Sequence, residues 1–186
     1  MISFQVIQIV IFFFATLFLI YISKNSLFNP RTHGFYRFFA FESCLLLILL
    51  NIPSWFTNPF SLKQIISWFL LIISAYLVFQ SFYFLKKMGG SKERKDSVNF
   101  KFENTSNLVK DGVYKYIRHP MYGSLLFLCL GAFLKNISFY SILLTVFTVL
   151  FLILTAKTEE KENINFFGHS YAEYMKETKM FVPFIF

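Results

Sequence analysis

The sequence predicts an all-α integral membrane protein with about five transmembrane helices. Of its 186 residues, 56% are hydrophobic, and Phe, Tyr and Trp together account for 22%. Charged residues make up only 15% of the chain, well below the roughly 25% of an ordinary soluble domain. A chain of this length cannot bury so many apolar side chains in its own core, so lipid must cover much of its surface. This composition excludes a disordered chain and argues against a soluble enzyme.

Five apolar runs give the expected helices in order: residues 2–21, 35–52, 64–85, 121–134 and 137–155. A spanning helix needs about 20 such residues, so the first three runs and the fifth are long enough or nearly so. We expect the first run to be a retained helix, because no Lys or Arg precedes it and no small-residue cleavage site follows. The fourth run is short for a hydrocarbon core about 30 Å thick. We expect it to form a tight hairpin with the fifth, around Lys135 and Asn136.

The basic residues predict the orientation of these helices. Nine of them fall between the third and fourth runs: Lys86, Lys87, Lys92, Arg94, Lys95, Lys101, Lys110, Lys115 and Arg118. If all five runs span, only Lys63 and Lys135 lie on the opposite side of the membrane. The positive-inside rule then places the N-terminus outside and the C-terminus in the cytoplasm. The net charge of +8 therefore orients the chain and does not indicate a nucleic-acid partner.

We expect one domain over residues 1–186, with three N-terminal spans in 1–85 and the polar, functional half in 86–186. The two cysteines, Cys44 and Cys129, lie inside apolar runs and have no metal-ligand spacing, so no metal site is expected.

Polar residues before the predicted hairpin form the first candidate site segment, residues 107–122. Pro120 suits the first position of a helix, whose free N–H groups favour an anionic group. His119, beside them, could donate or accept a hydrogen bond. In the alternative interpretation, His119 only caps the helix and Arg118 extends to lipid phosphates.

The second candidate segment is residues 157–162, expected at the cytoplasmic end of the fifth helix. Carboxylates there oppose the helix dipole, so Glu159 and Glu160 are not placed for helix stability. Either could hold a cationic group such as an ammonium. In the alternative, this is a solvated helix end in which Glu160 pairs with Lys157. The hairpin brings both segments together, and together they suit an amino acid moiety.

Aromatic residues recur at helical spacing in the C-terminal tail, at Phe167, Tyr171 and Tyr174. This pattern predicts an amphipathic helix at the membrane interface. The helix either anchors the tail or forms a lid over the corner between the two polar segments.

These segments also carry a motif set. The set is Lys110-x-Gly112-x-Tyr114-x-x-x-Arg118-His119-Pro120-x-Tyr122, then Glu159-Glu160, then Phe167-Gly168-x-x-Tyr171-x-x-Tyr174, then Pro183. It resembles the isoprenylcysteine carboxyl methyltransferases and the wider group of membrane phospholipid N-methyltransferases. The resemblance covers about the C-terminal half, from Leu108 onward, and the first three runs match only as apolar spans.

The resemblance implies an integral membrane methyltransferase that uses S-adenosylmethionine, bound in a cytoplasmic loop and by a glutamate. Carried over, the cofactor-binding residues are Ser106, Asn107, Leu108, Val109, Tyr114, His119, Pro120, Met121, Tyr122 and Glu159. Related enzymes carry an arginine, associated with a carboxylate substrate, four residues before the first glutamate of the pair. Here Thr155 holds that position, which leaves Lys157 as a candidate substrate residue. The chain has no G-x-G-x-x-G motif after a strand, in keeping with a membrane-type site.

The expected substrate is lipophilic or lipidated, with the carboxylate of an isoprenylcysteine-like compound as the first expectation. Phospholipid or small-thiol methylation is the enzymatic alternative, and a non-catalytic lipid-binding membrane protein is the other. A carboxylate nucleophile needs no general base, whereas an amine must lose a proton, so no catalytic residue is assigned. Glu42, an acid within the second run, either faces the substrate or extends to the membrane surface.

Overall fold

The computed structural model describes residues 4–90 and 105–185, and every helix predicted from the sequence is present in them. The elements are α1 (Phe4–Ser23), α2 (His33–Asn51), η1 (Ile52–Ser54), α3 (Leu62–Met88), η2 (Gly112–Lys115), α4 (Pro120–Lys135), α5 (Phe139–Phe167) and α6 (His169–Glu177). The start of the first run and four loop cations (Lys92, Arg94, Lys95 and Lys101) lie outside the described residues. The all-α prediction is confirmed for the part of the chain that is described.

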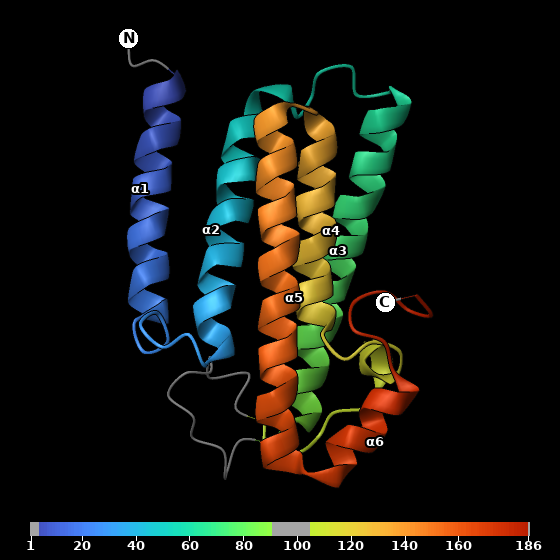
Figure 1. Ribbon diagram of the computed structural model, residues 1–186. Helices are drawn as coiled ribbons and strands as arrows, with labels where there is room; N and C mark the ends of the chain where they lie inside the picture. The colour runs from blue at the N-terminus through green and yellow to red at the C-terminus, as the bar shows by residue number, and fades with distance from the viewer. Residues whose placement is uncertain (1–3, 91–104, 186) are drawn as a thin grey trace.

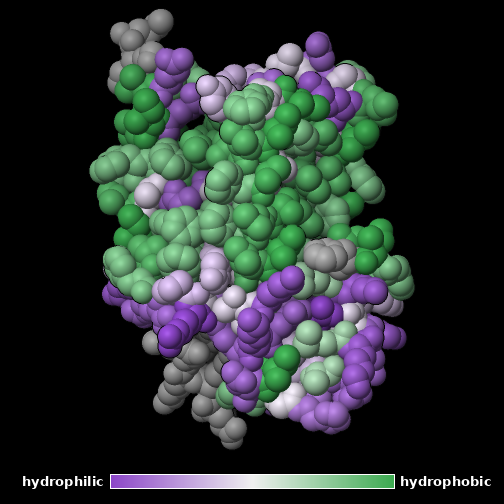
Figure 2. All heavy atoms as spheres, viewed as in Figure 1, coloured by the Kyte–Doolittle hydropathy of each residue, from purple (hydrophilic) through white to green (hydrophobic). Residues whose placement is uncertain are grey.

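The helices α1 to α5 run side by side, and α6 lies toward the end of the bundle opposite the N-terminus (Figure 1). Packing is strongest between α3 and α4 and between α2 and α5, whereas α1 packs against α2 at the edge of the bundle. Figure 2 shows an apolar band across the middle of the face in view, with polar residues toward both ends. The molecule therefore has the surface of an integral membrane protein.

Within the described residues, four helical segments are long and apolar enough to cross a membrane: Phe4–Ser23, His33–Ser54, Leu62–Met88 and Phe139–Phe167. The fourth predicted run forms α4, which has 16 residues and belongs to the shorter apolar helices. It begins at Pro120, as expected, and three residues separate its end from the start of α5. At 1.5 Å per residue it is about 24 Å long, so a fifth crossing stays a prediction.

Serine side chains of α3 fasten α4 to the bundle. Ser67 and Ser74 each donate a hydrogen bond from Oγ to a backbone carbonyl of α4, at Gly131 and Ser124, both at 2.7 Å. The helices approach closely at Gly131, where an added Cβ would lie 2.8 Å from Leu71 Cδ2 and 3.2 Å from the Ser67 carbonyl oxygen. Small residues allow such close approach between membrane helices.

The substitution Gly131→Ala is expected to lower the free energy of unfolding by about 1–3 kcal/mol, because the added methyl group overpacks this contact. Unfolding by a denaturing detergent, followed by circular dichroism, measures the change. In a Leu71→Ala background, the substitution Gly131→Ala should lower the free energy of unfolding by less than it does in the wild type. If Gly131→Ala unfolds like the wild type, the contact is not tight.

The fifth helix differs from its prediction. It was expected to end at Thr155, but α5 continues to Phe167 and ends where Gly168 adopts a φ of 61° and a ψ of −136°. The extension persists because Leu152, Ala156, Glu160 and Asn163 continue one buried stripe along the helix. Glu159 and Glu160 therefore lie about two turns before the helix end, and the argument from the helix dipole does not apply to them.

Lys135, expected in a polar turn, is instead the buried last residue of α4. Its ammonium donates a hydrogen bond to Gln64 Oε1 at 2.9 Å and lies 3.5 Å from the centre of the Trp68 ring. These contacts close the end of the bundle that lies opposite α6.

Candidate functional site

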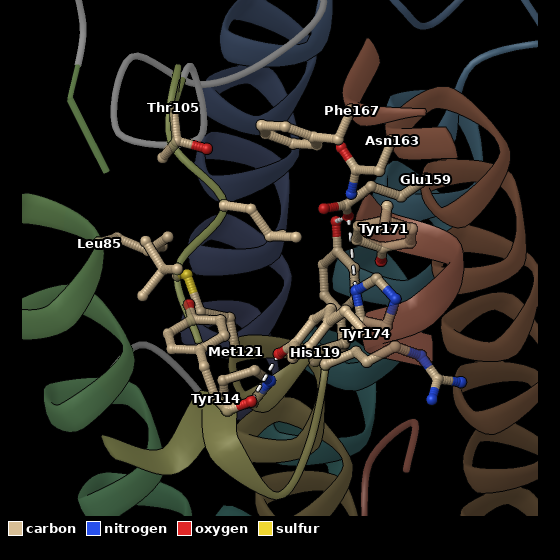
Figure 3. Close-up of a pocket in the computed structure, with 15 residues that line it drawn as sticks. Leu85, Thr105, Tyr114, His119, Met121, Glu159, Asn163, Phe167, Tyr171 and Tyr174 are labelled. Carbon is tan, nitrogen blue, oxygen red and sulfur yellow. Dashed lines mark hydrogen bonds and ion pairs between the residues drawn. The ribbon is translucent and has the colours of Figure 1, made fainter. Parts of the chain in front are cut away.

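A pocket lies at the polar end of the bundle, where α3 ends, α4 begins, and the extension of α5 meets α6 (Figure 3). Eight of the ten predicted cofactor residues line it: Leu108, Val109, Tyr114, His119, Pro120, Met121, Tyr122 and Glu159. Seven further residues complete the lining: Leu85, Thr105, Arg118, Asn163, Phe167, Tyr171 and Tyr174. The fold thus joins the two polar segments that the sequence singled out.

Ser106 and Asn107 are the two predicted cofactor residues that the pocket lining does not include. Their backbone N–H groups donate to the carbonyls of Gly90 and Gly89, at 3.4 Å and 2.9 Å. They therefore fasten the returning loop to the end of α3, which brings the adjacent Thr105 and Leu108 to the pocket.

The two candidate substrate residues also lie outside the lining. Lys157 is exposed on α5, and Glu42 accepts a hydrogen bond at 3.0 Å from Thr16 of α1. Their assignment to the substrate stays a prediction.

His119 lies between the two carboxylates of the Glu-Glu pair. Its Nδ1 is 3.9 Å from Glu159 Oε2, and its Nε2 is 3.5 Å from Glu160 Oε1. The imidazole is 5% exposed and stacks on the ring of Tyr122, whose hydroxyl donates to Glu159 Oε2 at 2.5 Å. His119 is the N-cap residue of α4, but its side chain makes no cap hydrogen bond to the helix and lies between the two carboxylates instead.

Arg118 is also placed differently from the alternative interpretation, in which it extends to lipid phosphates. Its guanidinium does not extend to the membrane surface, because its Nε donates to Glu160 Oε1 at 2.7 Å and both side chains are about nine-tenths buried. Glu160 therefore pairs with Arg118, whereas Lys157 is exposed.

The helix α6 presents its aromatic side chains to the pocket. Tyr171 and Tyr174 are 3% and 2% exposed, and the Tyr174 hydroxyl donates to the Tyr114 carbonyl at 2.6 Å. Phe167, at the end of α5, stacks on Tyr171 with ring centres 6.4 Å apart. Burial raises the pKa of both tyrosines, and the nearby Glu159 carboxylate raises that of Tyr171 further, so both stay protonated. This arrangement favours a lid over an anchor that turns its rings outward.

Three lining residues, Leu85, Thr105 and Asn163, were not predicted from the sequence. Asn163 lies one helical turn after Glu159 on the same face of α5, so the i, i+4 spacing would have identified it had the helix been extended correctly. Leu85 and Thr105 both line the pocket because the backbone of residues 106 and 107 is hydrogen-bonded to the end of α3. In Figure 3 they lie across the pocket from Asn163 and Phe167.

The chemistry of the lining fits S-adenosylmethionine. That molecule carries an ammonium, a carboxylate, a sulfonium and an adenine ring. Glu159 offers a carboxylate to a cationic group, and the rings of Phe167, Tyr122 and Tyr171 can stack on a base or face a sulfonium. His119 adds a buried imidazole to the wall of the pocket, with its Nδ1 3.9 Å from Glu159 Oε2.

Comparison with known proteins agrees with this geometry. The family model described as phospholipid methyltransferase matches residues 62–170, which is more than half of the chain. The chain is 37% identical over 79 residues to a protein-S-isoprenylcysteine O-methyltransferase of Schizosaccharomyces pombe, over 42% of this chain and 34% of that protein. It is 34% identical over 89 residues to the Saccharomyces cerevisiae protein of the same name, over 47% of this chain and 37% of that one. The chain thus spans about a third of the length of these relatives. No solved structure matches it.

Proposed function

The chain belongs to the phospholipid methyltransferase family, and we propose that it transfers a methyl group from S-adenosylmethionine to a lipophilic substrate in the membrane. The observation that carries this proposal is the convergence of Glu159, His119 and Tyr122 in one pocket, although they come from segments about 40 residues apart. The relatives named as methyltransferases support it.

In this proposal the lining residues divide the work of binding. Glu159 binds a cationic group of the cofactor, most simply the ammonium, and Tyr122 orients the carboxylate by its hydrogen bond. Phe167, Tyr171 and Tyr174 cover the pocket and exclude water, which a methyl transfer requires. The cofactor supplies an electrophilic methyl group on a sulfonium. Leu108 and Val109 contribute apolar side chains to the wall of the pocket.

The nucleophile we propose first is the carboxylate of an isoprenylcysteine-like compound. The names of the two relatives support it, and a carboxylate attacks without losing a proton. A phospholipid amine is the second candidate, because the family description names phospholipids and because His119, next to two carboxylates, could accept a proton. A lipidated protein is the partner that the first candidate implies.

We propose further that the pocket faces the cytoplasm and that the N-terminus lies outside. The described lysines near the pocket support this orientation, among them Lys110, Lys115, Lys161 and Lys176. At the opposite end, Lys135 is buried, which leaves Lys63 as the exposed described cation of that end.

Calorimetry with S-adenosylhomocysteine and the full chain in phosphatidylcholine nanodiscs tests the cofactor site. The wild type should bind, and His119→Ala should weaken binding by roughly tenfold, because the imidazole that lies beside Glu159 and stacks on Tyr122 is lost from the pocket wall. The matched control is His169→Ala on the outer face of α6, where the side chain is 86% exposed. Absence of binding by the wild type, or equal binding by both variants, would refute the proposed site.

Transfer of a labelled methyl group separates the two nucleophiles. A farnesyl-cysteine analogue should yield a base-labile methyl ester, whereas phosphatidylethanolamine would yield a base-stable N-methyl product. Labelling of the phospholipid alone would replace the first candidate by the second.

A further inference from the structure

The C-terminal segment, residues 178–181, runs alongside the residues that precede α4. Lys179 N–H donates to the Tyr116 carbonyl at 3.0 Å, and the N–H groups of Arg118 and His119 donate to the carbonyls of Lys179 and Met180, at 2.8 Å and 3.1 Å. The two stretches form a short parallel pair. The backbone position of His119 is therefore fixed by a segment about 60 residues later in the chain.

This segment is also anchored in the core of the bundle. Phe181 is 1% exposed and packs, together with Met180, against Tyr122, Leu152 and Ala156. The Phe181 ring lies edge-on to the His119 imidazole, with centres 6.4 Å apart. The C-terminal segment thus supports the wall of the pocket from behind without lining it.

One buried guanidinium joins this segment to α5 and α6. Arg118 Nη1 donates to the carbonyl of Met175 at 3.2 Å and to the carbonyl of Thr178, while Arg118 Nε donates to Glu160 at 2.7 Å. The Arg118 and Glu160 side chains are only 10% and 9% exposed. Removing one partner from such a pair leaves a buried charge without its counter-charge, which is strongly unfavourable.

The two adjacent glutamates face different partners. Successive residues of a helix point roughly 100° apart, so Glu159 and Glu160 project toward different neighbours. Glu159 lines the pocket and bonds to Tyr122, whereas Glu160 is bound to Arg118 behind it and lies 3.5 Å from His119 Nε2.

We propose that Glu160 is a positioning residue, which acts through Arg118 to hold the C-terminal segment and His119 in place for the cofactor that Glu159 binds. This inference rests on the proposed function. Loss of the Glu160 charge frees the guanidinium of Arg118 to move. The paired stretches 116–119 and 178–181 then lose their common tie to α5, and the pocket wall shifts although no pocket-lining side chain has been removed.

A double-mutant cycle on the full chain in nanodiscs tests this role, with affinity for S-adenosylhomocysteine as the readout. Glu160→Gln should weaken binding about tenfold. Arg118→Gln, which also removes a pocket-lining side chain, should weaken it at least as much, whereas the double variant should bind no more weakly than the weaker single variant. Glu160→Asp, which keeps the charge on a shorter side chain, should bind with intermediate affinity and serves also if Glu160→Gln does not fold. The matched control is Glu173→Gln, which removes an exposed pair with Lys176 on α6.

The measurement is made at a temperature at which circular dichroism shows every variant folded. A pair that serves stability alone would lower the melting temperature and leave the affinity of the folded protein unchanged, so that result would overturn the inference. Losses that multiply in the double variant would overturn it as well. If the wild type itself does not bind, the proposed function fails and the inference falls with it, whereas normal wild-type binding together with normal Glu160→Gln binding refutes the inference alone.

A second pair of variants tests the C-terminal segment itself. Phe181→Ala should weaken S-adenosylhomocysteine binding several-fold, and Phe184→Ala, at a side chain that is 83% exposed, should leave it unchanged. Equal affinities of these two variants would show that the segment does not support the pocket.

Discussion

Replacing Glu159 with glutamine is expected to weaken binding of S-adenosylhomocysteine by about 10- to 100-fold and to abolish most methyl transfer. A hydrogen bond to a charged group is worth about 1.5–3 kcal/mol, and the amide cannot balance the charge of an ammonium. The Glu159 side chain is 23% exposed, and Tyr122 already orients its carboxylate, so ligand binding loses little free energy in ordering this side chain. Calorimetry in nanodiscs measures the effect.

The control for this prediction is Tyr122→Phe, which removes the hydroxyl that orients Glu159 but keeps the ring that stacks on His119. It should weaken binding less, by about 0.5–1.5 kcal/mol. Should Glu159→Gln bind as tightly as the wild type, the ammonium is held elsewhere and the assignment of Glu159 is wrong.

Replacing Gly112 with alanine is expected to destabilise the fold by about 2–5 kcal/mol and to weaken cofactor binding as well. Gly112 has a φ of +60°, where an L side chain is strained, and its added Cβ would lie 2.0 Å from Cε2 of Phe84 on α3. Since Gly112 begins η2, which carries Tyr114 into the pocket, the displaced turn should alter the site. Denaturing-detergent unfolding and calorimetry measure the two effects.

Gly168→Ala is the matched control, because Gly168 has a φ of +61° but nothing within 4 Å of an added Cβ. It should show only the backbone cost, about 1–3 kcal/mol, and so destabilise less than Gly112→Ala. In a Phe84→Ala background, the substitution Gly112→Ala should destabilise the fold by less than it does in the wild type, because the collision with the Phe84 ring is absent. Equal destabilisation by the two glycine substitutions would contradict the predicted collision with Phe84.

The hydropathy pattern predicted the first four helices well and the fifth poorly. The run at 64–85 became Leu62–Met88, because an apolar run of that length has no other way to satisfy its backbone in lipid. The end of α5 was missed because residues after Thr155 are polar, and hydropathy cannot distinguish a polar helix from a tail. What sustains that part of the helix is the burial of Glu160 against Arg118, a contact between residues 42 positions apart.

Most of the candidate site was likewise predictable, but for a different reason. The family resemblance of the motif around His119 and Glu159 indicated eight of the lining residues. Ser106 and Asn107 belong to the same stretch, yet their backbone bonds to Gly90 and Gly89 give them a structural position outside the lining.

The sequence by itself determined the helical class, the membrane setting and the two polar segments that meet at one end of the bundle. These depend on run length, charge and short-range spacing, which are local properties of the chain. Only the tertiary structure decided that Glu160 pairs with Arg118 instead of Lys157, and that Lys135 is buried against the Trp68 ring instead of exposed in a turn. Those outcomes depend on partners distant in the sequence, Arg118 for Glu160 and Gln64 with Trp68 for Lys135, and no local pattern specifies which partner a folded chain will supply.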